Sequence, residues 1–264
     1  MDLSSWEEFE ERLKKLEEGA PRRSSFLLFR GQATHSWHLA TTLERYVPKH
    51  MSLKGYYKTI HAVKPKIETF TGAKWSILTP TKYQKWLEKH DMYVSIQNFP
   101  GLEYMIYLRH HGFPSPLLDW TRSPYIAAYF AFRGAAEAGE RVAIFAFREV
   151  AGGAKELTRE KPHIEILGSN IRSHQRHFLQ QSEYSICLVY EADTWFFTNH
   201  ELVCGDEQSE QDMLWKFTLP VSERSKVLRM LDGYNLNSFA LFASEEALME
   251  TMAMRELYFR GAGR

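Results

Sequence analysis

The chemically richest stretch of the chain runs from Arg109 to Phe132, RHHGFPSPLLDWTRSPYIAAYFAF. Its first half is rich in His, Gly and Pro, which predicts a polar turn. Its second half predicts an apolar helix that begins at Ser123-Pro124. Histidines exchange protons near neutral pH, and a carboxylate can orient them. His110, His111 and Asp119 could therefore act as acid–base groups, or could serve only as packing and hydrogen-bonding residues of the turn.

A second candidate is the arginine at the end of the apolar segment Ser24–Arg30, SSFLLFR, which predicts a strand. Burial of an arginine is costly without an anionic partner, and the glycine that follows, Gly31, allows another group to approach the backbone closely. Arg30 and Gly31 therefore indicate either an anion-binding site or an arginine paired with an internal carboxylate such as Asp119.

Two pairs of histidines have the spacing H-x-x-H, namely His35 with His38 and His174 with His177. A zinc site needs further cysteine, histidine or carboxylate ligands, and neither pair has such residues beside it. We therefore predict no metal site.

The composition is that of a soluble globular protein. The 264 residues include 33 Lys and Arg and 33 Asp and Glu, so the formal net charge is zero and does not steer the whole molecule toward nucleic acid. Two cysteines, Cys187 and Cys204, do not suggest a disulfide scaffold, so we expect the reducing cytoplasm. Neither a signal peptide nor an apolar run of roughly 20 residues is present, so we expect no membrane partner.

The hydrophobic pattern of the chain predicts the helices and strands that must position these residues. Together they indicate one α+β domain over residues 1–264. An N-terminal helix is predicted at 4–18, ended by Gly19 and Pro21. Further helices are expected at 98–108, 222–232 and 244–254, strands at 141–147 and 215–219, and a loop at 157–173. A polar segment beginning at Arg176 enters a strand whose first residues are Gln181, Ser182 and Glu183.

A lysine-rich insert is predicted at about residues 49–95. Residues 49–90 contain nine lysines and only two glutamates, and six aromatic residues lie among the lysines in the sequence. Lysines for phosphates and rings for stacking are typical of single-stranded nucleic-acid binding, with Lys82, Lys85 and Lys89 as candidate contacts. The alternative is a solvated helical insert whose aromatic residues pack inward.

Several of these stretches together resemble the FRG domain, named for its Phe-Arg-Gly motif. Phe29-Arg30-Gly31 matches that motif, and His110–Pro114 with Leu117–Thr121 match the central His, Gly and Pro signature followed by LLDWT. Other elements of the family match Leu43 with Arg45, Tyr125–Ala131, Arg176 with Gln180, and Leu236–Leu248. The chain departs from the family pattern at Arg109 (usually Gln), at Ser115 (usually Thr) and at Ser182-Glu183 (usually Gly and a small or apolar residue).

The order of parts also resembles the ADP-ribosyltransferase fold of the Arg-Ser-Glu class. This resemblance implies an α+β fold with a mixed, mostly antiparallel split β-sheet flanked by helices. Its three elements would be Arg30-Gly31, Asp119-Trp120-Thr121 and Gln181-Ser182-Glu183.

The same resemblance implies that NAD is the substrate and that Glu183 is the catalytic carboxylate, with Gln181 as a target-positioning group. Residues two apart on a strand share a face, and a carboxylate can stabilise the oxocarbenium ion that forms. The NAD-binding residues would be Arg30, Gly31, His110, His111, Asp119, Trp120 and Thr121.

We therefore expect transfer of ADP-ribose to a macromolecular target, or cleavage of NAD, in a bacterial toxin or anti-phage defence system. One alternative is a non-enzymatic module that senses a nucleotide or nucleic acid. Another is a phosphodiester hydrolase that uses a histidine of the turn together with Asp119.

Overall fold

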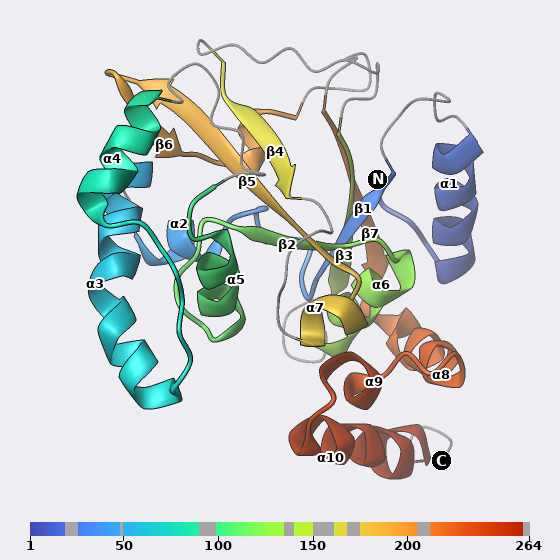
Figure 1. Ribbon diagram of the computed structural model, residues 1–264. Helices are drawn as coiled ribbons and strands as arrows, with labels where there is room; N and C mark the ends of the chain where they lie inside the picture. The colour runs from blue at the N-terminus through green and yellow to red at the C-terminus, as the bar shows by residue number, and fades with distance from the viewer. Residues whose placement is uncertain are drawn as a thin grey trace.

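The computed structural model describes residues 1–18, 26–47, 50–89, 99–134, 140–149, 161–167, 175–204 and 212–260. A central β-sheet crosses the molecule, and helices pack around it (Figure 1). Helix α1 (Trp6–Glu18) lies at one end of this sheet, and helices α3 (Leu53–Thr71) and α4 (Pro80–Lys89) lie at the other end (Figure 1).

The described residues form one sheet of seven strands in the order β4-β5-β2-β1-β3-β7, with β6 attached to β5. All pairings between these strands are antiparallel. The predicted α+β class with a mostly antiparallel sheet is thus confirmed, and the described strands contain no parallel pairing. The strands are β1 (Leu28–Gln32), β2 (Leu118–Thr121), β3 (Arg141–Arg148), β4 (His163–Leu167), β5 (Ser182–Glu191), β6 (Thr194–Phe197) and β7 (Met213–Pro220).

The pairing between strands changes at two places in the sheet. Leu188 pairs with both β4 and β6, while the first residues of β5 pair with β2, so β2 and β6 share one edge of β5. Strand β1 pairs with β3 along its whole length, but its pairing with β2 is limited to Phe29 and Thr121. Among the described residues no other register pair joins the two strands, and we call the place where their pairing ends the gap between β1 and β2.

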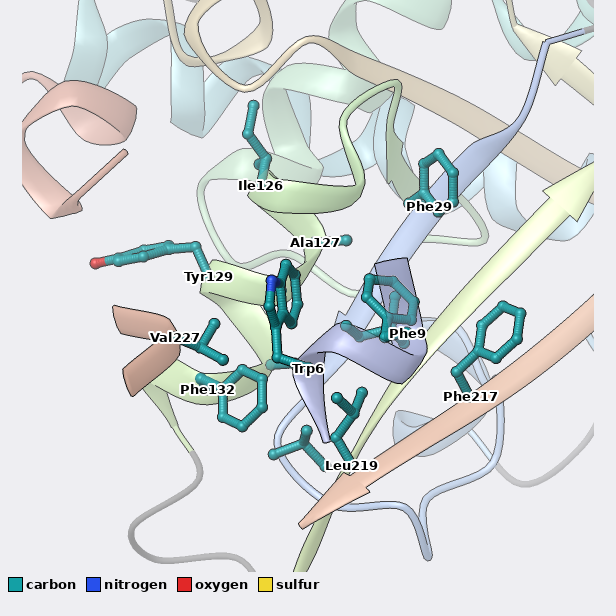
Figure 2. Close-up of a cluster of buried hydrophobic side chains, with 14 of the residues drawn as sticks. Trp6, Phe9, Phe29, Ile126, Ala127, Tyr129, Phe132, Phe217, Leu219 and Val227 are labelled. Carbon is teal, nitrogen blue, oxygen red and sulfur yellow. The ribbon is translucent and has the colours of Figure 1, made fainter. Parts of the chain in front are cut away.

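One helical layer covers β1, β3 and β7. It is built from α1 (Trp6–Glu18), α6 (Pro124–Arg133) and α8 (Arg224–Gly233), with α9 (Ser238–Phe242) beside them. Trp6 and Phe9 of α1 lie among side chains of α6 and β7 (Figure 2), and the Phe9 ring meets Phe217 edge-on at 5.5 Å. The apolar stripe of the predicted N-terminal helix is therefore part of the core.

A second helical layer covers β5 and β6 with α2 (Thr42–Tyr46), α3 (Leu53–Thr71), α4 (Pro80–Lys89) and α5 (Leu102–His110). Three tyrosines of the predicted insert are buried here, and the rings of Tyr57 and Tyr83 stack at 3.6 Å. Most aromatic residues of the insert thus pack inward, as the alternative of a solvated helical insert predicts, although Phe70 is exposed. Lys82, Lys85 and Lys89 are exposed on α4.

The chain ends in short helical elements. These are the 3-10 helix η4 (Val221–Glu223), then α8 and α9, then α10 (Glu245–Ala253), which continues into the π-helical segment η5 (Met254–Phe259). The helices predicted at 222–232 and 244–254 correspond to α8 and α10. The 3-10 helix η3 (His200–Leu202) follows β6 on the other side of the sheet from α6.

The structure corrects two expectations about secondary structure. Residues 163–167 form β4, although a loop was expected over 157–173. Pro162 suggested a loop, but a proline directly before an edge strand costs no ladder hydrogen bond. Helix α7 (Gln175–Leu179) precedes β5 where a polar segment was expected. The predicted helix end at Gly19 and Pro21, together with Lys49 and His174, lies outside the described residues.

None of the described helices is both long enough and apolar enough to cross a membrane.

Candidate functional site

A cleft of about 400 Å³ lies at the gap between β1 and β2. Paired residues of an antiparallel ladder share a face of the sheet, so Phe29, Thr121 and Ser182 lie on the face that α6 covers. Arg30 and Trp120 alternate to the opposite face. Because residues of both kinds line the cleft, it extends from the α6 face into the gap in the sheet.

Four arginines line this cleft, one each from β1, α2, α5 and α7. They are Arg30, Arg45, Arg109 and Arg176. Asp119 of β2 is the carboxylate among the lining residues. The cleft therefore carries an excess of positive charge in a chain whose overall formal charge is zero.

Arg30 and Arg109 converge on Asp119. Arg30 Nη1 donates to the carbonyl oxygen of Asp119 at 2.7 Å, and Arg109 Nη2 lies 2.6 Å from Asp119 Oδ2. The carboxylate of Asp119 is thus paired with Arg109, and Arg30 contacts only its backbone. Burial lowers the pKa of Arg30 to about 10; Asp119 opposes this shift, and the charges of Arg109 and Arg45 add to it. Arg30 remains protonated at neutral pH, in a site that favours an anion.

The hydrogen-bonding capacity of these arginines is not used up by the protein. The buried Nε atoms of Arg30 and Arg109 and the Oδ1 atom of Asp119 find no hydrogen-bond partner in the described part of the chain. An unsatisfied buried polar group costs about 1–3 kcal/mol. A site that keeps several of them together is typical of a binding site rather than of a structural ion pair.

Aromatic rings form other parts of the wall. The guanidinium of Arg176 lies 5.4 Å from the ring centroid of Phe242, and Phe130 meets Phe242 edge-on at 5.9 Å. These rings come from α6 and α9. Trp37, in the segment after β1, lines the cleft as well and is 49% exposed.

His110 and His111 lie at the end of α5 but line different cavities. His110 lines the cleft, and its Nε2 atom is 2.6 Å from the hydroxyl of Tyr184. His111 is exposed, packs its ring on Tyr107 at 4.2 Å, and lines a separate, mostly apolar groove of about 980 Å³ beside α3. The two histidines of the predicted turn therefore do not share a site.

Tyr184 connects His110 to α7. Its hydroxyl is also 3.3 Å from Nδ1 of His177, and the rings of His177 and Tyr184 stack nearly in parallel, 5.6 Å apart and at 14°. Tyr184 is fully buried and pairs with Asp119 in the ladder. Burial lowers the pKa of His177, and the charge of Arg122 adds to this shift.

Gly31 has a structural reason to be glycine. A Cβ atom at this position would lie 1.9 Å from the carbonyl oxygen of Ala127 and 2.7 Å from the backbone nitrogen of Ala131. The group that approaches the Gly31 backbone is therefore helix α6. Gly31 lines the cleft, but packing alone already excludes a side chain there.

Trp120 and Thr121 contribute to the cleft in different ways. Thr121 faces it and accepts a hydrogen bond from the backbone nitrogen of Ser123 at 3.1 Å. The indole of Trp120 points to the opposite face, where it donates to Ser185 Oγ at 2.7 Å. Ser185 Oγ is in turn 2.8 Å from Nε2 of the buried His200. These hydrogen bonds connect β2 to β5 and His200 on the face of the sheet opposite α6.

Glu183 is not among the residues that line the cleft. It is paired with Trp120 in the ladder and is 1% exposed, and its Oε1 atom accepts from Arg122 Nε at 2.7 Å. Burial raises the pKa of Glu183, and Arg122 opposes this shift. Gln181 lies in the turn before β5, exposed and with a φ of 47°. Because β5 begins at Ser182, Gln181 and Glu183 do not share a strand face, and their catalytic roles stay predictions.

Among the described residues, no group of three or more His, Cys, Asp or Glu side chains could hold a metal ion. His38 contacts Glu201 with an Nδ1–Oε2 distance of 3.3 Å.

Several residues of the cleft had no assigned role in the sequence. Arg45, Arg109 and Arg176 were visible only as matches to the FRG pattern or a departure from it. Tyr184 carried no signal and His177 stood out only as half of an H-x-x-H pair, because the contact that joins β5, α5 and α7 exists only in the folded chain. A count of arginines at the family motifs would have found the positive cleft.

Residues 25–140 match the family model of the FRG domain. The match extends from the segment before β1 to the residue before β3, so it includes α5, β2 and α6 but neither β5 nor α9. It confirms the resemblance carried by the Phe-Arg-Gly and LLDWT motifs. Searches of the curated proteins and of the solved structures found no match to the chain.

Proposed function

We propose that the FRG domain of this chain, completed by α7, β5 and α9, binds NAD in the cleft and transfers its ADP-ribose group to a macromolecular acceptor or to water. The observation that supports this proposal is the set of four arginines around one carboxylate. Guanidinium groups bind phosphate oxygens through two parallel hydrogen bonds, and NAD carries a pyrophosphate.

The remaining wall of the cleft suits the other parts of NAD. Trp37, Phe130 and Phe242 offer rings that can pack against adenine and nicotinamide. The hydroxyls of Thr121 and Ser182 can form hydrogen bonds with ribose hydroxyls. The volume of about 400 Å³ lies in the usual range for pockets that bind small molecules, about 300–1,000 Å³.

The reaction also needs a negative group near the ribose. Cleavage of the bond to nicotinamide develops positive charge on the sugar, which a carboxylate can stabilise. Asp119 lines the cleft and Glu183 does not, so Asp119 is the first candidate for this carboxylate. Glu183 can take this role only if Arg122 releases it and the start of β5 shifts.

Binding is tested first, by titration calorimetry with NAD. Arg109→Gln and Arg176→Gln should each weaken binding by about 10-fold or more, because a hydrogen bond to a charged group contributes about 1.5–3 kcal/mol. Arg12→Gln changes an exposed arginine of α1 and should bind like the wild type. Equal affinity in all three variants would contradict the proposed site.

Turnover is tested next, with labelled NAD, cell extract and a measurement of released nicotinamide. If Asp119 is the stabilising carboxylate, Asp119→Asn should lower the rate about 100-fold or more while Glu183→Gln has a small effect. The reverse result would assign the role to Glu183. Intact binding without label transfer or nicotinamide release would favour the alternative, a non-enzymatic nucleotide sensor.

A nucleic-acid contact through α4 is the second candidate, because Lys82, Lys85 and Lys89 are all exposed there. Joint replacement of these lysines by glutamine should abolish a salt-dependent affinity for RNA or DNA if that contact exists. NAD binding should not change, since none of the three lines the cleft.

An enzyme that transfers ADP-ribose from NAD would suit a bacterial toxin or anti-phage defence system, the setting that the family resemblance suggested.

A further inference from the structure

We propose that His110 takes up the proton released during the transfer reaction, and that Tyr184 and His177 are positioning residues that fix the His110 ring for this task. The inference rests on the proposed function, since it concerns a step of that reaction. It assigns a role to two residues, Tyr184 and His177, that do not line the cleft themselves.

The reaction requires a proton acceptor. The bond between C1′ of the ribose and the nicotinamide nitrogen breaks, and its electron pair neutralises the nicotinamide ring. The acceptor atom of the target, or of water, forms the new bond to C1′ and must lose a proton. That proton needs a base close to C1′, within the cleft.

Among the lining residues, His110 is best suited to be this base. A guanidinium group offers no acceptor for a proton, and the Asp119 carboxylate is already engaged by Arg109 at 2.6 Å. A histidine ring gains and loses a proton near neutral pH, as a general base must. His110 reaches the cleft from the end of α5, beside Arg109.

The contacts of Tyr184 fit one arrangement of protons in which the tautomer of His110 suits a base. In this arrangement Nδ1 of His177 accepts the hydrogen bond of the Tyr184 hydroxyl across 3.3 Å, and burial, which lowers the pKa of His177, favours the neutral ring that can do so. The Tyr184 oxygen then accepts from Nε2–H of His110 at 2.6 Å. In this arrangement the neutral His110 ring carries its proton on Nε2, and Nδ1 is its basic nitrogen. After proton uptake, Nε2–H still donates to Tyr184, so the ring keeps its orientation.

The support for this arrangement is rigid. Tyr184 is fully buried in β5, and its backbone pairs with Asp119 of β2, whose side chain lines the cleft. The His177 ring stacks on the Tyr184 ring, so α7 holds the other side of the hydroxyl. A ring that is held from a central strand and a neighbouring helix can place His110 with the accuracy that catalysis needs.

The hydrogen-bonded chain is tested by NMR on the ¹⁵N-labelled full chain, where two-bond ¹H–¹⁵N spectra show which ring nitrogen of each histidine carries the proton. The wild type should show His110 protonated on Nε2. Tyr184→Phe, which keeps the ring, should mix the His110 tautomers and shift the His177 signals. Tyr107→Phe removes a hydroxyl from α5 outside the cleft and should change neither histidine's tautomer. An Nδ1–H tautomer in the wild type, or no effect of Tyr184→Phe, would overturn the positioning role.

The proton role is tested by NAD turnover across pH. His110→Gln should lower kcat about 100-fold with little change in NAD affinity, and Tyr184→Phe should lower kcat about 10-fold and move the acid limb of the pH profile. An unchanged kcat for His110→Gln would refute the proposal. If the wild type binds NAD without releasing nicotinamide, the transfer reaction fails and the proton role with it, whereas the NMR result still decides whether Tyr184 and His177 fix the His110 ring.

Discussion

Arg30 and Gly31 are neighbours in the chain, but the fold uses them for two different purposes. Arg30 extends into the gap between β1 and β2 and donates to the carbonyl of Asp119. Gly31 points to the other face, where the backbone of α6 leaves no room for a side chain. The Phe-Arg-Gly motif therefore combines an arginine that contacts Asp119 in the cleft with a glycine that the packing of α6 requires, since alternate residues of a strand face opposite sides.

Replacement of Gly31 by alanine should destabilise the protein by about 2–3 kcal/mol, the usual effect of overfilling a tightly packed site. The new methyl group would lie 1.9 Å from the carbonyl oxygen of Ala127, and backbone atoms cannot easily move away. Gly233→Ala is the matched control, because nothing lies within 4 Å of a Cβ atom at that position. Urea denaturation measures both variants, and a Gly31→Ala variant as stable as the wild type would contradict the packing argument.

At the scale of elements, the connection from β2 to α6 sets the position of the cleft wall. Ser123 caps α6, with its hydroxyl accepting from the backbone nitrogen of Ile126 at 3.3 Å, and Pro124 occupies the first helical turn. Thr121 accepts from the Ser123 backbone nitrogen, so the strand and the cap are joined directly. On the other side of the cleft, Gln180 Nε2 donates to the carbonyl of Leu241 and ties α7 to α9.

Loss of the α6 cap should lower the free energy of unfolding without changing a residue that lines the cleft. Ser123→Ala removes the oxygen that satisfies a free backbone N–H group and should cost about 1 kcal/mol of unfolding free energy. Ser123→Asp keeps a cap oxygen and should restore most of that loss. Thermal and urea denaturation give the comparison, and equal destabilisation by alanine and aspartate would show that the cap is not the cause.

At the scale of the whole molecule, the cleft forms where the two helical layers meet over the divided sheet. The layer of α1, α6 and α8 covers β1, β3 and β7, and the layer of α2 to α5 covers β5 and β6. The opposite face carries a third apolar cluster, and Nε2 of the buried His200 lies 2.8 Å from Ser185 Oγ on that face. Burial lowers the pKa of His200 to about 3, and the charge of Arg30 adds to the shift.

This buried histidine should make stability depend on pH. In the unfolded chain His200 binds a proton near its ordinary pKa of 6.5, whereas the folded protein keeps it neutral down to about 3. The contribution is therefore present above pH 6.5 and is lost as pH falls toward 3, by up to about 1.4 kcal/mol per pH unit. Urea denaturation between pH 7 and 5 should show this slope, reduced in His200→Gln and kept in His61→Gln on α3. An equal slope in His200→Gln would contradict the assignment.

The sequence by itself determined the parts whose signal is local. Hydrophobic periodicity located α1, β3, β7, α8 and α10, because a core-facing stripe repeats with the period of its helix or strand. The Phe-Arg-Gly and LLDWT motifs carried the resemblance to the FRG domain, whose family model matches residues 25–140, and they lie on β1 and β2, the two strands that border the cleft.

Only the tertiary structure decided which of these residues meet. His110 and His111 are adjacent in sequence but line separate cavities, because the end of α5 points them apart. Glu183 alternates to the opposite face from Ser182 and pairs with Arg122, while Arg45, Arg109 and Arg176 come together from α2, α5 and α7. Such contacts depend on strand register and on the packing of distant helices, and neither quantity is written in any local stretch of the chain.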